Sequence, residues 1–197
     1  MKNIKSRFAG AGAVIFEIIA AATLIICAAG GKRRNVFMSF LAAFCALLPF
    51  TAAQIAKIKD IVMPESFTLV SLLFVISAQY FGEVLRFYYT IWWWDLLLHG
   101  VFGLYAVVVG VYITCGIIIK DVRSTDKRFF LFTVIFAFCF SMAIGQLWEL
   151  FEFVGDYLFK SNMMKEGLKD TMTDLLASTV TAAAGSVVYY LRKRKQE

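Results

Sequence analysis

Six side chains that could bind a metal ion recur at helical spacing in the last three long apolar segments. They are Asp95, His99, Glu149, Glu152, Asp170 and Asp174. Within each segment the two residues are three or four positions apart, so an α-helix would present both on one face. Carboxylate oxygens with a single imidazole suit magnesium, manganese, zinc or non-haem iron. The spacing therefore predicts a divalent-metal site, without choosing the metal.

Each of these side chains has an expected role. The expected metal ligands are Glu149, Glu152, Asp170, Asp174 and His99. His99 is a ligand or a general base, and Asp95 orients its ring, so these two are the expected catalytic residues. The alternative is a polar cap, in which the same acids lie in terminal turns of helices and face water.

The segments that carry these residues belong to a membrane protein. Hydrophobic residues make up 60% of the 197 residues, and the mean hydropathy is +0.74. A water-soluble domain could not cover that much apolar surface with 17% charged residues. We expect an all-α bundle forming one integral membrane domain over residues 1–197, with about six helices of the roughly 20 residues needed to cross a bilayer. The expected spans are residues 9–29, 35–53, 66–88, 92–119, 129–159 and 170–191.

The net charge of +6 does not indicate a nucleic-acid partner, because the basic residues lie mostly in loops and tails beside apolar runs. There they set the orientation of the chain. Most of the 20 lysines and arginines fall inside the cell when both termini are cytoplasmic, and the basic triplet 32–34 is the main exception. We therefore expect a multi-pass protein of the bacterial inner (plasma) membrane, with membrane lipids around it. The sequence does not set its oligomeric state.

Connectivity collects the polar residues on one side of the membrane. The end of the third span, the start of the fourth, the end of the fifth and the start of the sixth share that side. Gln79, Glu83 and Asp156 thereby join the six residues in one layer, expected in the outer leaflet. The expected counter-charges near this layer are Arg86 and Lys169.

On each of these helix faces, small residues lie next to the pair of polar residues. The three stripes contain Gly103, Ala106 and Gly110; Ser141 and Gly145; and Ser178, Thr181 and Gly185. Small residues let membrane helices approach closely. We therefore expect the polar groups to face the interior of the bundle and not the lipid.

The same residues carry a resemblance to a known family. The segments WWWDLLLHGVFGLY, GQLWELFEFVGDY and KDTMTDLLASTVTAAAG resemble the YjdF-like family of bacterial inner-membrane proteins and, more loosely, VanZ-like membrane proteins. The YjdF-like pattern has Asp and His in one span, two Glu in the next and two Asp in the last. The six residues named above fill those places, and the resemblance covers residues 83–185. It implies the membrane fold and the site residues, but no particular reaction.

Three classes of function remain open. A metal-dependent membrane hydrolase could act on the headgroup of a lipid or lipid-linked phosphate or ester, whose acyl chain would stay in the membrane. A cation or proton carrier would need stepping sites deeper in the membrane, at Glu17, Ser178 and Thr181. Otherwise Glu17 is a protonated or paired structural carboxyl. The third class is a non-catalytic membrane protein whose acidic cap binds a partner.

Reporter fusions test the expected orientation. Fusions within residues 32–34 and 160–169 should report a periplasmic location, and fusions within residues 120–128 and the C-terminal tail a cytoplasmic one. A periplasmic 120–128 loop would place the acidic layer at the cytoplasmic face instead, and a periplasmic substrate would then be impossible.

Overall fold

The computed structural model describes residues 4–159, 163–165 and 167–194. Within them the chain is helical and contains no β-strand. Six helical stretches are long and apolar enough to cross a membrane, which confirms the expected all-α membrane fold. These stretches are Ile4–Ala29, Arg33–Ile58, Phe67–Val84, Trp94–Ile117, Asp126–Leu158 and Leu168–Arg194.

The chain divides into two compact units, Met1–Trp94 and Asp95–Glu197. The first contains α1 (Ile4–Ala29), α2 (Arg33–Ala46), α3 (Leu48–Ile58), α4 (Phe67–Val75), the π-helix η1 (Ile76–Val84) and α5 (Phe87–Thr90). The second is built from α6 (Trp94–Ile117), α7 (Asp126–Phe159) and α8 (Leu168–Arg194). That residues 1–197 form a single membrane domain stays a prediction.

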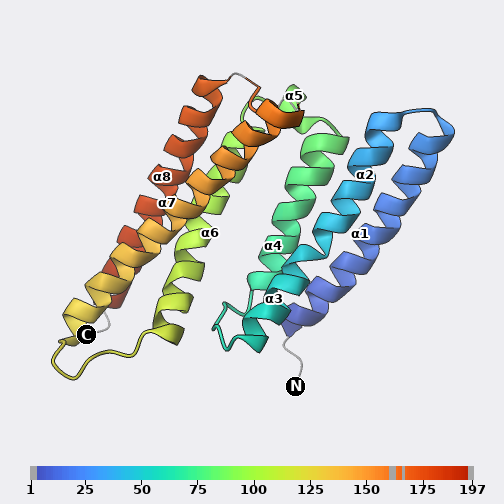
Figure 1. Ribbon diagram of the computed structural model, residues 1–197. Coiled ribbons are helices and arrows are strands. Elements are labelled where there is room, and N and C mark those ends of the chain that lie inside the picture. Colours follow the sequence, from blue (N-terminus) through green and yellow to red (C-terminus); the bar gives the residue numbers. More distant parts are fainter. Residues whose placement is uncertain (1–3, 160–162, 166, 195–197) are drawn as a thin grey trace. The chain divides into compact units, whose positions relative to one another are not determined.

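In the first unit, α1, α2 and α4 alternate in direction (Figure 1). They pack around a core of mostly small side chains: Ala13, Phe16, Ala20, Ala42, Ala46 and Leu72. The hydroxyl groups of Thr23 and Tyr80 are hydrogen-bonded at 2.8 Å. The ring of Phe16 also meets the Tyr80 ring edge-on, with centroids 5.6 Å apart. These contacts join α1 to η1.

The second span is longer than expected and is made of two helices. It continues to Ile58 instead of residue 53, and it is interrupted at Leu47, between α2 and α3. Pro49 lies in the first turn of α3. Proline has no N–H to donate and is therefore tolerated at the start of a helix but not inside one. The break in the span follows from this residue.

The third span ends earlier than expected, at Val84 instead of residue 88. Arg86 has a φ of 64°, in the left-handed region that a right-handed helix cannot contain. The chain then turns back, and the ring of Tyr88 packs against Gly82 so closely that a Cβ there would collide with it. Glycine at this position is what allows the turn.

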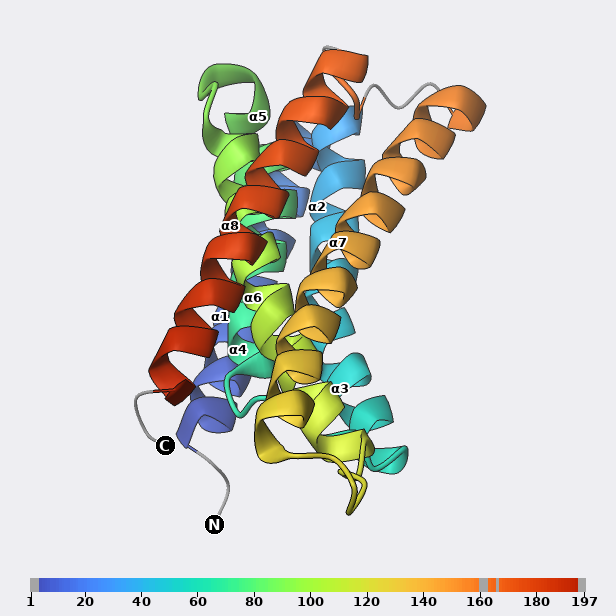
Figure 2. The same cartoon turned by 90° about the vertical axis from the view of Figure 1, so that its left-hand side faces the viewer.

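In the second unit, α6, α7 and α8 also alternate in direction, as Figures 1 and 2 show. The start of α6, the end of α7 and the start of α8 therefore lie at the same end of this unit. Its helices meet through small residues: Gly103 packs against Ser178, and Gly110 against Ala137. The hydroxyl of Ser141 also donates a hydrogen bond of 2.9 Å to the Gly103 carbonyl.

The polar residues face the interior of this unit, as the stripes of small residues predict. On α8, buried residues recur every four positions: Asp174, Ser178, Ala182 and Ser186. On α7, Ser141, Gly145 and Glu149 are buried at the same spacing. On α6, the buried face includes His99, Gly103, Ala106 and Gly110. One face of each helix thus combines small residues with a buried ionisable group.

Replacing Gly103 with alanine should destabilise this unit. A Cβ there would collide with the Ser178 backbone and lie 2.7 Å from Oγ1 of Thr181. Overpacking of this kind usually costs about 1–3 kcal/mol, which thermal unfolding of the purified protein in detergent would measure. Gly145→Ala is the matched control, because its Cβ would make an ordinary contact, 3.7 Å from Oγ of Ser178. Equal effects of the two substitutions would contradict this account.

Candidate functional site

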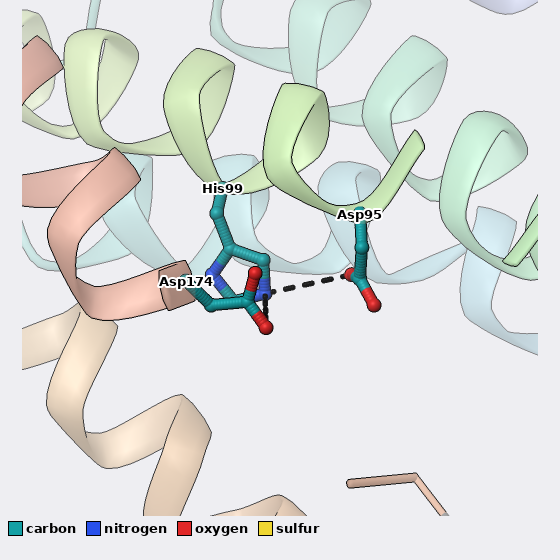
Figure 3. Close-up of side chains that lie close together, drawn as sticks. All are labelled: Asp95, His99 and Asp174. Atoms are coloured by element: carbon teal, nitrogen blue, oxygen red, sulfur yellow. Dashed lines mark ion pairs between the residues drawn. The ribbon is translucent and has the colours of Figure 1, made fainter. Parts of the chain in front are cut away.

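A buried histidine lies between two aspartates at the end of the second unit where α6 and α8 begin. The Nε2 atom of His99 is 3.7 Å from Oδ1 of Asp95, one turn earlier on α6. The same nitrogen is 3.9 Å from Oδ2 of Asp174 on α8. One ligand atom from each of the three residues falls within 4.8 Å of the others. Figure 3 shows the imidazole nitrogen facing both carboxylates.

The other imidazole nitrogen faces a carboxylate on α7. Nδ1 of His99 is 3.6 Å from Oε1 of Glu149. Glu149 is only 4% exposed, and the side-chain hydroxyl of Thr171 on α8 interacts with its carboxylate. An ionised carboxylate can accept about four hydrogen bonds, so this single hydroxyl leaves Glu149 suited to a further proton donor or a cation.

A lysine that the sequence analysis did not single out borders this cluster. The ammonium of Lys165 lies 2.6 Å from Oδ2 of Asp95. Its backbone N–H also donates a hydrogen bond of 3.1 Å to Oδ2 of Asp170. Asp95 therefore directs one oxygen toward Lys165 and the other toward His99. Lys165 lies in the connection between two helices, where no periodic pattern could have assigned it to a site.

The structure thus brings together four of the six expected residues: Asp95, His99, Glu149 and Asp174. The other two lie near enough to interact electrostatically with these residues, and each also accepts a hydrogen bond. Glu152 accepts a hydrogen bond of 2.8 Å from the indole N–H of Trp148, one turn earlier on α7. Asp170 accepts the backbone hydrogen bond from Lys165.

Asp156, another expected member of the layer, holds the connection between α7 and α8. Its two carboxylate oxygens accept hydrogen bonds from the backbone N–H groups of Met163 and Met164, at 2.7 and 2.9 Å. Because these bonds fix the chain just before Lys165, Asp156 has a structural role in presenting that lysine.

The remaining expected members belong to the first unit. Glu83 forms an ion pair of 2.6 Å with Arg34, which also donates to the Glu83 carbonyl. Gln79 is partly buried on η1. Of the expected counter-charges, Arg86 lies over the ring of Tyr89, 5.0 Å from its centroid. The other, Lys169, is exposed in the first turn of α8.

Comparison with known proteins assigns the chain to a family. The model of the predicted membrane protein family DUF2238 matches residues 12–195. The chain belongs to the DUF2238 family. A Thermotoga maritima protein described as uncharacterized is 30% identical over 137 residues, which cover 70% of this chain and 68% of that relative. No solved structure matches this DUF2238 protein. The looser likeness to VanZ-like proteins receives no support from these matches.

In this DUF2238 protein, replacing Asp156 with alanine should loosen the connection between α7 and α8. The amides of Met163 and Met164 would lose their acceptor, and a hydrogen bond to a charged group contributes about 1.5–3 kcal/mol. Hydrogen exchange at these two amides should therefore become at least about tenfold faster. Asp121→Ala is the matched control, since Asp121 accepts a similar bond from the backbone of Arg123 in the preceding connection. Unchanged exchange in Asp156→Ala would contradict this role.

Proposed function

We propose that this protein binds one divalent cation through Asp95, His99 and Asp174, near one boundary of the membrane. Metal–ligand distances of about 2.0–2.6 Å place two ligands of one ion about 3–5 Å apart. The distances of 3.7 and 3.9 Å from Nε2 of His99 to the two aspartates lie within that range. A small shift of these side chains would let all three reach one ion.

The observation that carries the proposal is Glu149, a buried carboxylate on the opposite side of the imidazole ring. It is only 4% exposed, and its Oε1 lies 3.6 Å from Nδ1 of His99. A histidine that binds metal through one nitrogen usually donates its other N–H to a carboxylate or carbonyl, which fixes the ring. Glu149 is placed to accept that bond when Nε2 binds the ion.

These roles differ from those expected from spacing alone. Asp95 becomes a ligand, and Glu149 becomes the residue that orients the ring. His99 is a ligand in this proposal and not the general base, because its two nitrogens are both engaged. Glu152 and Asp170 fall outside the ligand set, because neither belongs to the group of ligand atoms that lie within 4.8 Å of one another.

The balance of charge supports a cation at this place. Three carboxylates, those of Asp95, Glu149 and Asp174, surround one imidazole, and Lys165 supplies a single positive charge beside them. Uncompensated carboxylates in an apolar interior repel one another and lose their hydration, which costs several kcal/mol for each ion. A divalent cation relieves both effects at once.

We further propose that the site belongs to a hydrolase of the inner membrane that acts on the headgroup end of a lipid or lipid-linked substrate. The proposed ligands lie within the first two turns of α6 and α8, where a headgroup would be. Exposed apolar side chains on α7, such as Leu147, Phe151 and Val154, could contact its acyl chain. A bound divalent ion would polarise a phosphoryl or acyl oxygen toward attack by water.

A cation carrier has less support. It would need polar groups deeper in the membrane, and the hydroxyls of Ser178 and Thr181 instead donate to carbonyls of their own helix. Such bonds leave these two hydroxyls less free to coordinate a passing ion.

We also infer that the YjdF-like resemblance and the DUF2238 match describe one family. The resemblance covers residues 83–185, which lie entirely within the matched residues 12–195. The proposed ligands on α6 and α8 are among them.

Metal analysis of the purified protein, without a histidine tag, tests the proposal. About one divalent ion per chain should be found, and it should raise the unfolding temperature because it binds only the folded bundle. Asp174→Asn should lower the affinity most, since an amide keeps the shape but loses the charge. Glu149→Gln should lower it by about 10–100-fold, as expected for a residue that orients a ligand.

Glu152→Gln is the matched control, because it removes a carboxylate of the same helix that already accepts a hydrogen bond. This variant should bind metal as the wild type does. The site would be refuted if the wild-type protein contained no metal and its unfolding temperature changed with neither chelator nor added divalent ions.

A further inference from the structure

We propose that Lys165 binds a phosphoryl group, so that the site takes a phosphate ester and not a neutral acyl ester. This inference rests on the proposed metal site. Lys165 and Asp95 have equally buried side chains, each 20% exposed, and their charged groups are 2.6 Å apart. The ammonium is therefore next to a proposed metal ligand and still reachable from the boundary of the unit.

The geometry of Asp95 shows how a phosphoryl group would fit. One of its oxygens faces Lys165 and the other faces Nε2 of His99, where the ion is proposed to bind. The ammonium and the ion would thus be joined by the three atoms O–C–O of one carboxylate. A phosphoryl group offers the same kind of bridge, O–P–O, between the same two positive groups. Charge-assisted hydrogen bonds from lysine to phosphate are a common form of phosphate recognition.

The charge of Lys165 also favours an anionic substrate. Lys165 pairs with a carboxylate of this cluster, and without it a phosphate would meet only carboxylates beside the ion. A neutral ester has no charge for the ammonium to pair with.

The backbone holds Lys165 in this position independently of its side chain. Its N–H is bonded to Asp170, and the two preceding amides are bonded to Asp156. A change of the lysine side chain leaves all three of these bonds in place, so substitutions can test its charge separately from the path of the chain.

The experiment measures binding of inorganic phosphate to the metal-loaded protein in detergent by calorimetry. The wild type should bind phosphate only when loaded with the divalent ion. Lys165→Met should weaken phosphate binding by about tenfold or more, while metal affinity stays the same or rises because a nearby positive charge is gone. Lys165→Arg should retain phosphate binding, since it keeps the charge and the donors. Lys169→Met removes an exposed charge of the same region and should change neither affinity.

A second arm separates a lipid headgroup from a free phosphate. Phosphatidic acid in mixed micelles should bind more tightly than inorganic phosphate, and this binding should also depend on Lys165. Equal or weaker binding of the lipid would overturn its assignment to a headgroup and restrict the site to water-soluble phosphates.

Three results would overturn the inference. Phosphate binding by metal-loaded Lys165→Met at wild-type strength would remove the role of the lysine and leave the metal site intact. If acetate bound as tightly as phosphate, the site would bind carboxylates in general and would not be specific for a phosphoryl group. Failure of the wild type to bind any divalent ion would overturn the metal site and this inference together.

Discussion

The contact between Gly103 and the backbone of Ser178 sets the distance between α6 and α8, and the cluster depends on it. His99 lies one turn before Gly103, and Asp174 lies one turn before Ser178. Because both offsets are four residues, the close approach at the glycine also brings the imidazole and the carboxylate to within 3.9 Å of each other. A side chain at position 103 would separate the helices and the two groups together. Packing and chemistry here are set by the same contact.

The third helix is fixed to the same glycine. Ser141 on α7 donates a hydrogen bond to the Gly103 carbonyl, and Glu149 follows two turns later, beside His99. A carbonyl within a helix normally accepts only from its own helix, so a second bond from another helix holds α7 at a definite height along α6. This matters in an apolar interior, where each ionisable group is costly alone. Small residues along three helix faces bring these groups close enough to compensate one another.

Much of this arrangement could be predicted from the sequence. Helical spacing placed Asp95 and His99 on one face, and connectivity placed Glu149 and Asp174 at the same end of their bundle. The proposed exchange of roles between Asp95 and Glu149 could not be predicted, because it depends on which imidazole nitrogen faces which helix. That is set by the rotation of each helix about its axis, which spacing does not report. Lys165 was missed because a connection has no period from which its neighbours could be inferred.

The acids near the end of α7 differ in which groups pair with their carboxylates. Asp156, three residues before the end of the helix at Phe159, binds backbone amides of the connection. Glu152, one turn deeper, is reached by the indole of Trp148. Glu149, deeper still, lies beside the imidazole of His99 and the hydroxyl of Thr171. A hydroxyl and a neutral imidazole do not offset the charge of a buried carboxylate, so a proton or a nearby cation would stabilise it. Of the three acids, Glu149 therefore has the environment that most favours the proposed metal site.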